Sequence, residues 1–137
     1  MRVMKIQDYD QVYDLWLKCD NLDIDPVDES RQAMERYLER NPRTCLVHEE
    51  DEKIVGVILG GHDGRRGRLY HLAVDPQYRH KGIGDMLMKG AVQALAKEGI
   101  RRIGFFVYKE NLGARKLFKR EGFNERDDLI YLDKDLI

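Results

Sequence analysis

The sequence predicts a single layered α/β domain, and three observations lead to this class. Segments with the residue pattern of strands are interleaved with segments whose apolar residues recur at helical spacing. The resulting order is β-α-α-β-β-β-α-β-α-β, with its last strand at residues 129–132, and it contains no internal repeat and no linker. The 137 residues suffice for one hydrophobic core, so we expect one domain over residues 1–137.

The N-terminal part is predicted to contain a strand and two helices. Residues 1–6 alternate in the manner of a strand, and Asp8 is placed to cap the helix whose apolar residues recur over residues 12–19. The acidic segment 20–29 contains a proline, which predicts a loop. Ser30 then precedes a second helical pattern.

Three strands are predicted next. The second helix is closed by Asn41-Pro42, because the residue before a proline is biased away from helical backbone. Residues 44–48 and 54–59 are rich in strand-forming residues, and the charged run 49–52 between them predicts a hairpin turn. A glycine-rich turn leads to the third strand, at residues 69–74.

The C-terminal part alternates helices with strands. From residue 82 to residue 97 the apolar positions fall four apart, which is one face of an amphipathic helix, and Gly99 ends it. Residues 102–108 are strand-like. The next helix covers residues 111–121, with Gly122 in the position that favours a left-handed cap.

Composition and charge exclude several classes of protein. Lys and Arg number 24 against 25 Asp and Glu, so bulk electrostatics do not favour nucleic acid. No apolar run is long enough to cross a bilayer. Cys19 and Cys45 lack metal-ligand spacing, and Cys45 lies in an apolar run that favours a buried reduced thiol. Without closely spaced cysteines or a signal peptide, we expect a cytoplasmic protein with no metal, nucleic-acid or membrane partner.

The most informative segment is residues 69–84, where a strand leads through a short turn into a helix that starts with glycines. Helix starts present unpaired N–H groups and partial positive charge, and glycine lets an anion approach them. Arg79, His80 and Lys81 add positive charge where a helix built for stability carries acids. The segment predicts an anion site; the alternative is a glycine-rich turn that only joins strand to helix.

Two common nucleotide-binding loops do not match this segment. A Walker loop requires Gly-Lys-Ser/Thr, which does not follow Gly84, and a dinucleotide fingerprint requires a third glycine where Leu87 stands. The run Arg79-x-x-Gly82-x-Gly84 instead resembles the acetyl-CoA signature of the GNAT N-acetyltransferases. Residues 111–123, with the pattern Asn-x-x-Ala-x-x-Leu-Phe-x-x-x-Gly-Phe, are similar to the second signature of that family.

The resemblance implies a fold and a cosubstrate. GNAT proteins have a mixed, mostly antiparallel twisted sheet with helices on both faces, and they hold acetyl-CoA in a cleft between two splayed strands. Here those strands would be the ones at residues 69–74 and 102–108, with backbone contacts along the first and at the following helix start. The implied acetyl-CoA-binding residues are Leu72, Ala73, Val74, Arg79, His80, Lys81, Gly82, Ile83, Gly84, Asp85, Asn111 and Phe118.

Acetyl transfer to an amine requires a neutral nitrogen and a stabilised oxyanion. A backbone N–H of Ala73 or Val74 is the expected oxyanion donor. His71 is the expected base because imidazole titrates near neutral pH, with a water chain as an alternative. Strand alternation allows only one of His71 and Tyr70 to face the cleft. The other interpretation of His71 is a packed strand residue.

The general acid departs from the family pattern. The family often places a tyrosine on the last helix to protonate the departing CoA, and Phe118 stands at that position here. Tyr108, Tyr131 and a water are the candidates that remain, and we expect Tyr108 to be the acid. A thiol pKa near ~8.5 also makes the thiolate a tolerable leaving group without an acid.

We therefore expect an N-acetyltransferase that transfers acetyl from acetyl-CoA to a primary amine, on a small molecule or a protein N-terminus, in a ternary complex. The acidic segment 20–29 borders the acceptor cleft in this family, and its charge would attract a cationic amine. A solvated loop is the alternative interpretation of that segment. The rival function is a non-catalytic acyl-CoA-binding or protein-interaction module, and a homodimer is left open.

Overall fold

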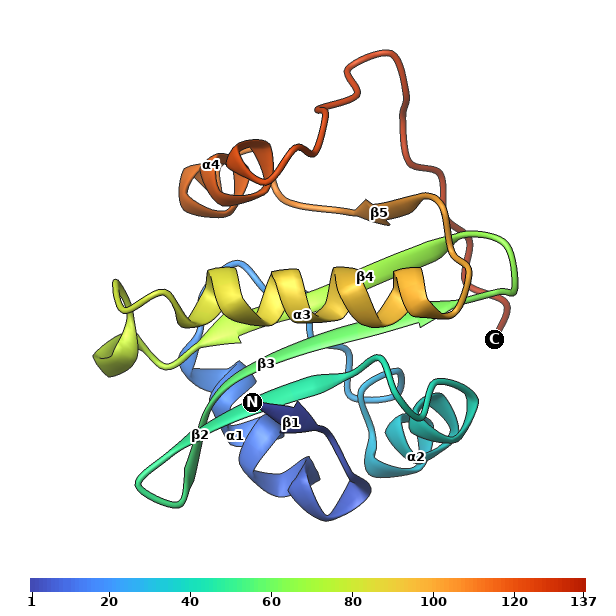
Figure 1. The fold of residues 1–137 in the computed structure, drawn as a ribbon. Helices are drawn as coiled ribbons and strands as arrows, with labels where there is room; N and C mark the ends of the chain where they lie inside the picture. Colours follow the sequence, from blue (N-terminus) through green and yellow to red (C-terminus); the bar gives the residue numbers. More distant parts are fainter. The chain divides into compact units, whose positions relative to one another are not determined.

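The computed structural model describes all 137 residues as two compact units, Met1–Phe106 and Val107–Ile137. The first unit contains a five-stranded sheet in the order β1-β2-β3-β4-β5. The first three pairs are antiparallel, whereas β4 and β5 run parallel, so the predicted mixed and mostly antiparallel sheet is confirmed (Figure 1). The strands are β1 (Arg2–Val3), β2 (Leu46–Glu50), β3 (Lys53–His62), β4 (Gly67–Val74) and β5 (Ile103–Phe105).

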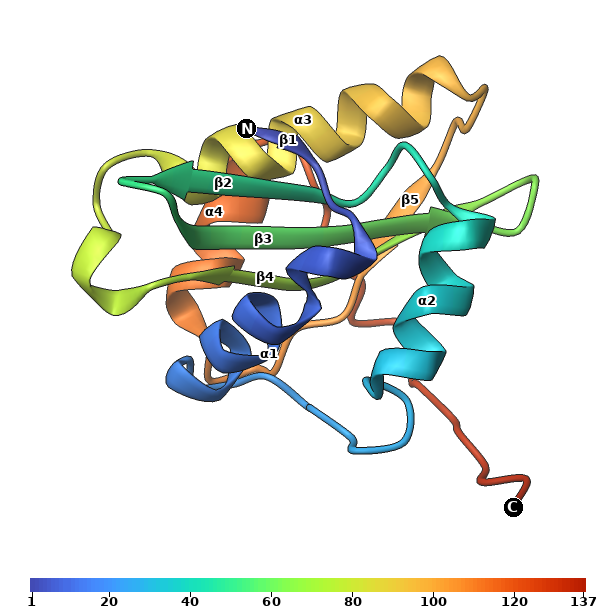
Figure 2. The ribbon, with the colours of Figure 1, turned by 90° about the horizontal axis from the view of Figure 1, so that it is seen from below.

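Helices cover both faces of this sheet, as predicted. The helices α1 (Tyr9–Lys18) and α2 (Arg31–Arg40) lie on one face and α3 (Ile83–Lys97) lies on the other, as the two views show (Figures 1 and 2). Two glycines of β3 show that these helices lie on opposite faces. A Cβ at Gly56 would meet α3, whereas a Cβ at Gly61 would meet α2. Two short 3-10 helices, η1 (Ile6–Asp8) and η2 (Pro76–Tyr78), complete the unit.

The face that carries α1 and α2 is closed by a hydrophobic core. Trp16 is 1% exposed, and it shares one cluster with Met34 of α2 and with Val57 and Leu59 of β3. The free Cys45 belongs to this cluster too, and its burial raises the pKa of the thiol to about 12. The prediction of a buried reduced thiol is therefore confirmed. This core holds α1 against β4, the strand that carries the predicted site residues 71–74.

Local signals explain most helix ends. The Ser30 hydroxyl accepts a hydrogen bond from the Ala33 N–H and caps α2. Gly99 has a φ of +86° just after α3, where a left-handed residue lets the chain bond back to the last turn. Asp8 precedes α1 as predicted, but its side chain caps no α1 amide and instead binds Arg2 and the Lys5 N–H. Its predicted capping role is wrong because the Arg2 guanidinium takes the carboxylate.

The β2–β3 hairpin forms at the predicted charged run. Asp51 and Glu52 have φ values of +53° and +63°, and Glu50 pairs with Lys53 across them. Two consecutive positive φ values are the twist that a two-residue hairpin loop requires. The turn therefore forms without the glycine that usually supplies this backbone.

The second unit contains one helix, α4 (Leu112–Arg120). The Asn111 side chain accepts a hydrogen bond from the Ala114 N–H at its start. At its end Gly122 has a φ of +91°, and the N–H groups of Gly122 and Phe123 bond to the carbonyls of Lys119 and Phe118. These bonds and the contact of the Phe118 and Phe123 rings (4.9 Å) form a Schellman motif, so the predicted left-handed cap is confirmed.

The predicted last strand is wrong. Residues 129–132 adopt no regular structure, and their large apolar side chains are exposed. A strand is stabilised by its cross-strand neighbours, and strand propensity without a hydrogen-bonded partner does not form one. The predicted strand at residues 102–108 also shrinks to Ile103–Phe105, the only part that pairs with β4.

Candidate active site

The strand β4 extends beyond the end of its parallel neighbour β5. Their pairing covers Gly67 to Leu69 of β4 and stops at Phe105, where β5 ends, whereas β4 continues to Val74. The antiparallel pairing of β4 with β3 extends to Val74 on its other side. The second half of β4 thus has one edge paired with β3 and one edge without a strand partner, and the resemblance predicts the cofactor cleft along the latter.

Strand geometry decides which backbone groups point to this open edge. The Asp75 N–H donates to the Val55 carbonyl at 2.8 Å, so Val74, which lies opposite Gly56, occupies a non-hydrogen-bonded position. Its N–H and C=O therefore point away from β3. Ala73 points toward β3, because successive residues alternate. Of the two predicted oxyanion donors, the geometry favours Val74.

The turn after β4 is held by side-chain hydrogen bonds. The buried Asp75 carboxylate accepts the Gln77 N–H at 3.0 Å and lies 3.5 Å from the ammonium groups of Lys18 and Lys53. The Gln77 N–H, with the two lysines, lowers the pKa of Asp75. The carboxylate is thus charged at neutral pH and ties α1, β3 and the turn together.

Two residues with left-handed backbone lead into α3. His80 has a φ of +63° and Gly82 a φ of +82°, and a Cβ at Gly82 would meet no atom within 4 Å. The first hydrogen bond of the helix runs from the Met86 N–H to the Gly82 carbonyl. The N–H groups of Ile83 and Gly84 therefore have no partner within the helix. This arrangement fits an anionic phosphate group.

Most side chains around the predicted anion site engage other parts of the protein, whereas the backbone amides remain available. The Arg79 guanidinium turns back to β4, where its Nε donates to the Val74 carbonyl at 3.1 Å. The Lys81 ammonium lies 5.2 Å from the centre of the Tyr78 ring. Ile83 is buried beneath Gly56, so it offers an amide but no side chain to a ligand. Asp85 pairs with Lys89 at 3.1 Å. The anion-binding groups are thus mainly backbone groups.

His71 lies at a β-bulge that the sequence pattern does not reveal. Val57 pairs with Ala73 but Leu59 pairs with Tyr70, so β4 contains one extra residue, and His71 has a φ of +50°. The bulge interrupts alternation: the His71 ring contacts Trp16 of α1, and the Tyr70 ring contacts Tyr37 of α2. Both side chains thus lie on the α1–α2 side of the sheet, so the strand alternation from which one cleft-facing residue was expected does not hold here.

His71 is paired with the acidic segment between α1 and α2. Its Nε2 lies 2.9 Å from Oε1 of Glu29, and the two side chains are 12% and 13% exposed. The segment is anchored by Leu22 and Ile24, which pack against the core. Asp25 forms a local turn by accepting the N–H groups of Val27 and Asp28, and these bonds lower its pKa. Glu29 is therefore the inward-facing acid of a segment that sequence reasoning treated as one charged group.

The remaining predicted residues lie in the second unit. Asn111 caps α4 with its side-chain oxygen, and its N–H donates to the Tyr108 carbonyl at 3.0 Å. Phe118 is buried and packs against Phe123. The Tyr108 side chain is exposed. A cysteine that sequence reasoning did not assign to the site lies near it: the Cys19 thiol is 3.5 Å from the Val74 carbonyl, and burial raises its pKa.

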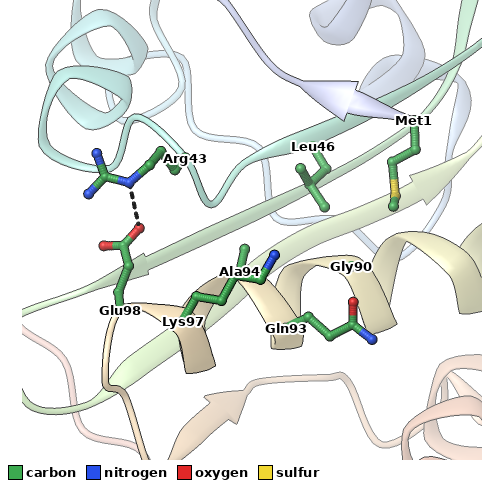
Figure 3. Close-up of a pocket in the computed structure, with 8 residues that line it drawn as sticks. All are labelled: Met1, Arg43, Leu46, Gly90, Gln93, Ala94, Lys97 and Glu98. Atoms are coloured by element: carbon green, nitrogen blue, oxygen red, sulfur yellow. Dashed lines mark ion pairs between the residues drawn. The ribbon is translucent and has the colours of Figure 1, made fainter.

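A separate surface pocket of about 710 Å³ lies between the start of β2 and the C-terminal half of α3 (Figure 3). Arg43 and Glu98 form an ion pair at one end of it, and Met1 and Leu46 lie at the other. None of the predicted site residues lines this pocket. No group of three or more His, Cys, Asp or Glu side chains is placed to hold a metal ion. No helix combines the length and apolar character needed to cross a membrane.

Comparison with known proteins matches this geometry to one family. The model of the acetyltransferase (GNAT) family matches residues 9–123. An acetyltransferase of Sodalis glossinidius is 33% identical over 137 residues, covering 100% of this chain and 95% of its own length.

Two solved structures share the fold at lower identity. Diaminobutyrate acetyltransferase EctA from Paenibacillus lautus, in complex with L-2,4-diaminobutyric acid and coenzyme A, has a TM-score of 0.73 at 24% identity and covers 88% of this chain and 72% of its own. The ribosomal-protein-S18-alanine N-acetyltransferase from Escherichia coli has a TM-score of 0.73 at 21% identity, with coverages of 90% and 76%. Acceptors within this fold thus range from small amines to proteins. With the family model spanning most of its length, the chain belongs to the GNAT family and is an acetyl-CoA-dependent acetyltransferase.

Proposed function

We propose that this protein transfers acetyl from acetyl-CoA to a primary amine by direct attack in a ternary complex, in the cytoplasm, with the whole chain acting as one domain. The observation that carries the proposal is the open edge of β4 leading into the amides of Ile83 and Gly84, which have no helical partner at the start of α3. The first feature suits the amide-bearing pantetheine arm, which can bond along a strand edge. The second suits the pyrophosphate.

The backbone of β4 also serves the reacting carbonyl. The Val74 N–H points to the open edge, where it stabilises the negative charge that develops on the acetyl oxygen. The Val74 carbonyl is already engaged by Arg79 at 3.1 Å. Arg79 therefore contributes by holding the strand end rather than by direct contact with phosphate. Asn111 and Phe118 are retained as cofactor contacts on the family resemblance alone.

Proton transfer is assigned to His71 and Tyr108. We assign His71 to take a proton from the acceptor ammonium. It directly precedes Leu72 in β4, and its ring contacts Glu29 of the acidic segment. The nitrogen then attacks the thioester carbonyl and gives up its remaining extra proton to solvent water, the C–S bond breaks, and the departing thiolate takes a proton from Tyr108. Tyr131 and a water are the alternatives for that last proton.

The acceptor is proposed to be a cationic primary amine. The segment between α1 and α2 that supplies Glu29 to His71 also carries exposed carboxylates, and their potential attracts a positive charge. Asp20, Asp23 and Asp28 are exposed there. Small diamines, amino acids and protein N-termini all present such a group. We therefore propose a cationic primary amine without choosing among these three classes.

The experiment is an acceptor screen monitored by release of free CoA thiol. Diamines, amino acids and N-terminal peptides are each incubated with acetyl-CoA and the protein, and at least one class is expected to give acceptor-dependent thiol release. Thermal unfolding in acetyl-CoA, NADH and ATP forms the binding control, with the largest rise in melting temperature expected for acetyl-CoA. Binding of acetyl-CoA without thiol release from any amine would instead favour the non-catalytic acyl-CoA-binding module.

A further inference from the structure

We infer that Glu29 is a positioning residue for His71. Its carboxylate accepts a hydrogen bond from the protonated Nε2, which leaves the lone pair of Nδ1 available to take the proton of the acceptor ammonium. The inference rests on the proposed base role of His71. Its main observation is the 2.9 Å contact between Nε2 and Oε1, formed between two side chains that are only 12% and 13% exposed.

The surroundings of His71 restrict its ring to this arrangement. The Trp16 ring meets the His71 ring edge-on at a centroid distance of 5.2 Å, and Tyr70 does so at 6.2 Å. The backbone of His71 has a φ of +50°, which is uncommon for a residue with a side chain and is held by the bulge. Strained backbone held by its surroundings is a frequent feature of functional sites.

Glu29 is fixed as firmly as the ring that it contacts. Its Oε2 accepts the Asp25 N–H at 2.7 Å, which leaves Oε1 for His71. Its backbone carbonyl accepts the Tyr9 hydroxyl at 2.7 Å, and its N–H donates to the Asp25 carbonyl. Glu29 is therefore held by three hydrogen bonds besides its contact with His71, one to its carboxylate and two to its backbone.

This geometry determines which ring nitrogen is basic. A carboxylate only accepts hydrogen bonds, so the neutral imidazole carries its proton on Nε2 and its lone pair on Nδ1. Nδ1 has no hydrogen-bond partner within the protein. When Nδ1 takes the ammonium proton, the ring becomes cationic, and the adjacent carboxylate stabilises that charge. The freed lone pair of the amine then forms the N–C bond, the nitrogen gives up its remaining extra proton to solvent water, and the C–S bond breaks as the CoA sulfur leaves as thiolate.

A purely structural role for the same contact makes different predictions. Glu29 also closes the acidic segment through Asp25, so its loss can loosen the segment without affecting the base. Glu29→Gln separates the two roles. The Gln oxygen can still accept the Asp25 N–H, but the amide NH₂ then faces Nε2 and favours the tautomer with its proton on Nδ1.

The tautomer is measured first, because it does not depend on activity. Nitrogen-15 chemical shifts of the His71 ring are expected to show the proton on Nε2 in the wild type and on Nδ1 in Glu29→Gln. A wild-type ring with its proton on Nδ1 overturns the inference, whatever amine the enzyme accepts.

Kinetics supply the second test. Glu29→Gln is expected to lower kcat by about tenfold or more, leave the KM for acetyl-CoA unchanged, and move the acidic limb of the pH–rate profile to lower pH. Glu35→Gln, the same change at an exposed position of α2, is the matched control and is expected to behave as the wild type. A raised KM or lowered melting temperature with an unchanged kcat profile overturns the inference and assigns Glu29 to the loop.

The failures of the two proposals are distinguishable. If His71→Gln loses activity and Glu29→Gln does not, the base assignment stands and the positioning role is wrong. If His71→Gln keeps full activity, the base assignment in the proposed function is wrong, and the role of Glu29 is rejected with it.

Discussion

Gly82 and Gly84 stand two residues apart at the start of α3 and have different backbone conformations. Gly82 has a φ of +82°, whereas Gly84 lies within the helix and is not among the glycines with positive φ. Gly82→Ala is therefore expected to lower the free energy of unfolding by roughly 1–2 kcal/mol. Gly84→Ala is expected to raise it by up to about 1 kcal/mol, because alanine is the better helix former. Urea denaturation of both variants measures the difference, and equal losses would contradict it.

Gly84→Glu tests the anion site itself. A side chain at Gly84 lies beside the free amides, and a carboxylate there adds bulk and like charge next to a phosphate. The variant is expected to fold, since an acid in the first turn is favourable by ~0.3–1 kcal/mol, but to lose most of its affinity for acetyl-CoA. Calorimetric titration decides the matter, with Gly84→Ala as the folded control. Wild-type affinity in the Glu variant would remove the binding-loop assignment.

At the scale of elements, helix signals predicted more than strand signals did. Ser30, Gly99 and Gly122 act where the sequence placed them, because a cap depends on a hydrogen bond or a φ angle within a few residues. The helices α1 to α4 accordingly lie within a residue or two of their predicted bounds. The strand predicted at residues 129–132 does not form, because a strand also depends on a distant partner.

The bulge in β4 limited what could be predicted of the site. Val74 and the helix start were identified from their motif, and the structure gives each a backbone group aimed outward. The Glu29–His71 contact joins residues 42 positions apart. No local sequence pattern indicates the extra residue in β4 that places His71 toward α1, because a bulge depends on the register of two paired strands and not on composition.

Phe118 on α4 allows a test of the acid. Phe118→Tyr places a phenol where the family resemblance expects one, and the Schellman motif with Phe123 retains its ring contact. Affinity for acetyl-CoA is expected to stay within about twofold, and kcat with a basic amine to stay equal or rise by up to about 10²-fold, the lower range for a positioned acid. Steady-state kinetics measure both. Unfolding of the variant would show that the buried position excludes a hydroxyl.

At the scale of the whole molecule, acid stability depends on carboxylates held in charged contacts. The Arg2 guanidinium donates two hydrogen bonds of 2.8 Å to the buried Asp8, and this contact lowers the pKa of Asp8 below its ordinary 3.8. A carboxyl with a lowered folded pKa stabilises the protein above its unfolded pKa. That stabilisation is lost as the pH falls through the folded value.

Asp8→Asn is therefore expected to destabilise the protein by about 1–2 kcal/mol at pH 7, a discounted value because Arg2 is half-exposed. The difference from the wild type is expected to shrink as the pH falls below the ordinary carboxyl pKa and to vanish once Asp8 is protonated in the folded protein. Urea denaturation across this range gives the comparison. Asp10→Asn, which removes a charge from an 88% exposed side chain, should change little at any pH.

The open edge of β4 also has a consequence for the protein without its ligand. An unpaired strand edge is a template for another strand, so ligand-free protein is exposed to edge-to-edge aggregation at Leu72 and Val74. A bound pantetheine arm would occupy that edge in place of a neighbouring chain. Deuterium exchange at the Leu72 and Val74 amides is therefore expected to be fast in the free protein and strongly slowed by acetyl-CoA, and stored protein is expected to precipitate more slowly with the ligand present. Colloidal stability would then depend on the cellular supply of the cosubstrate.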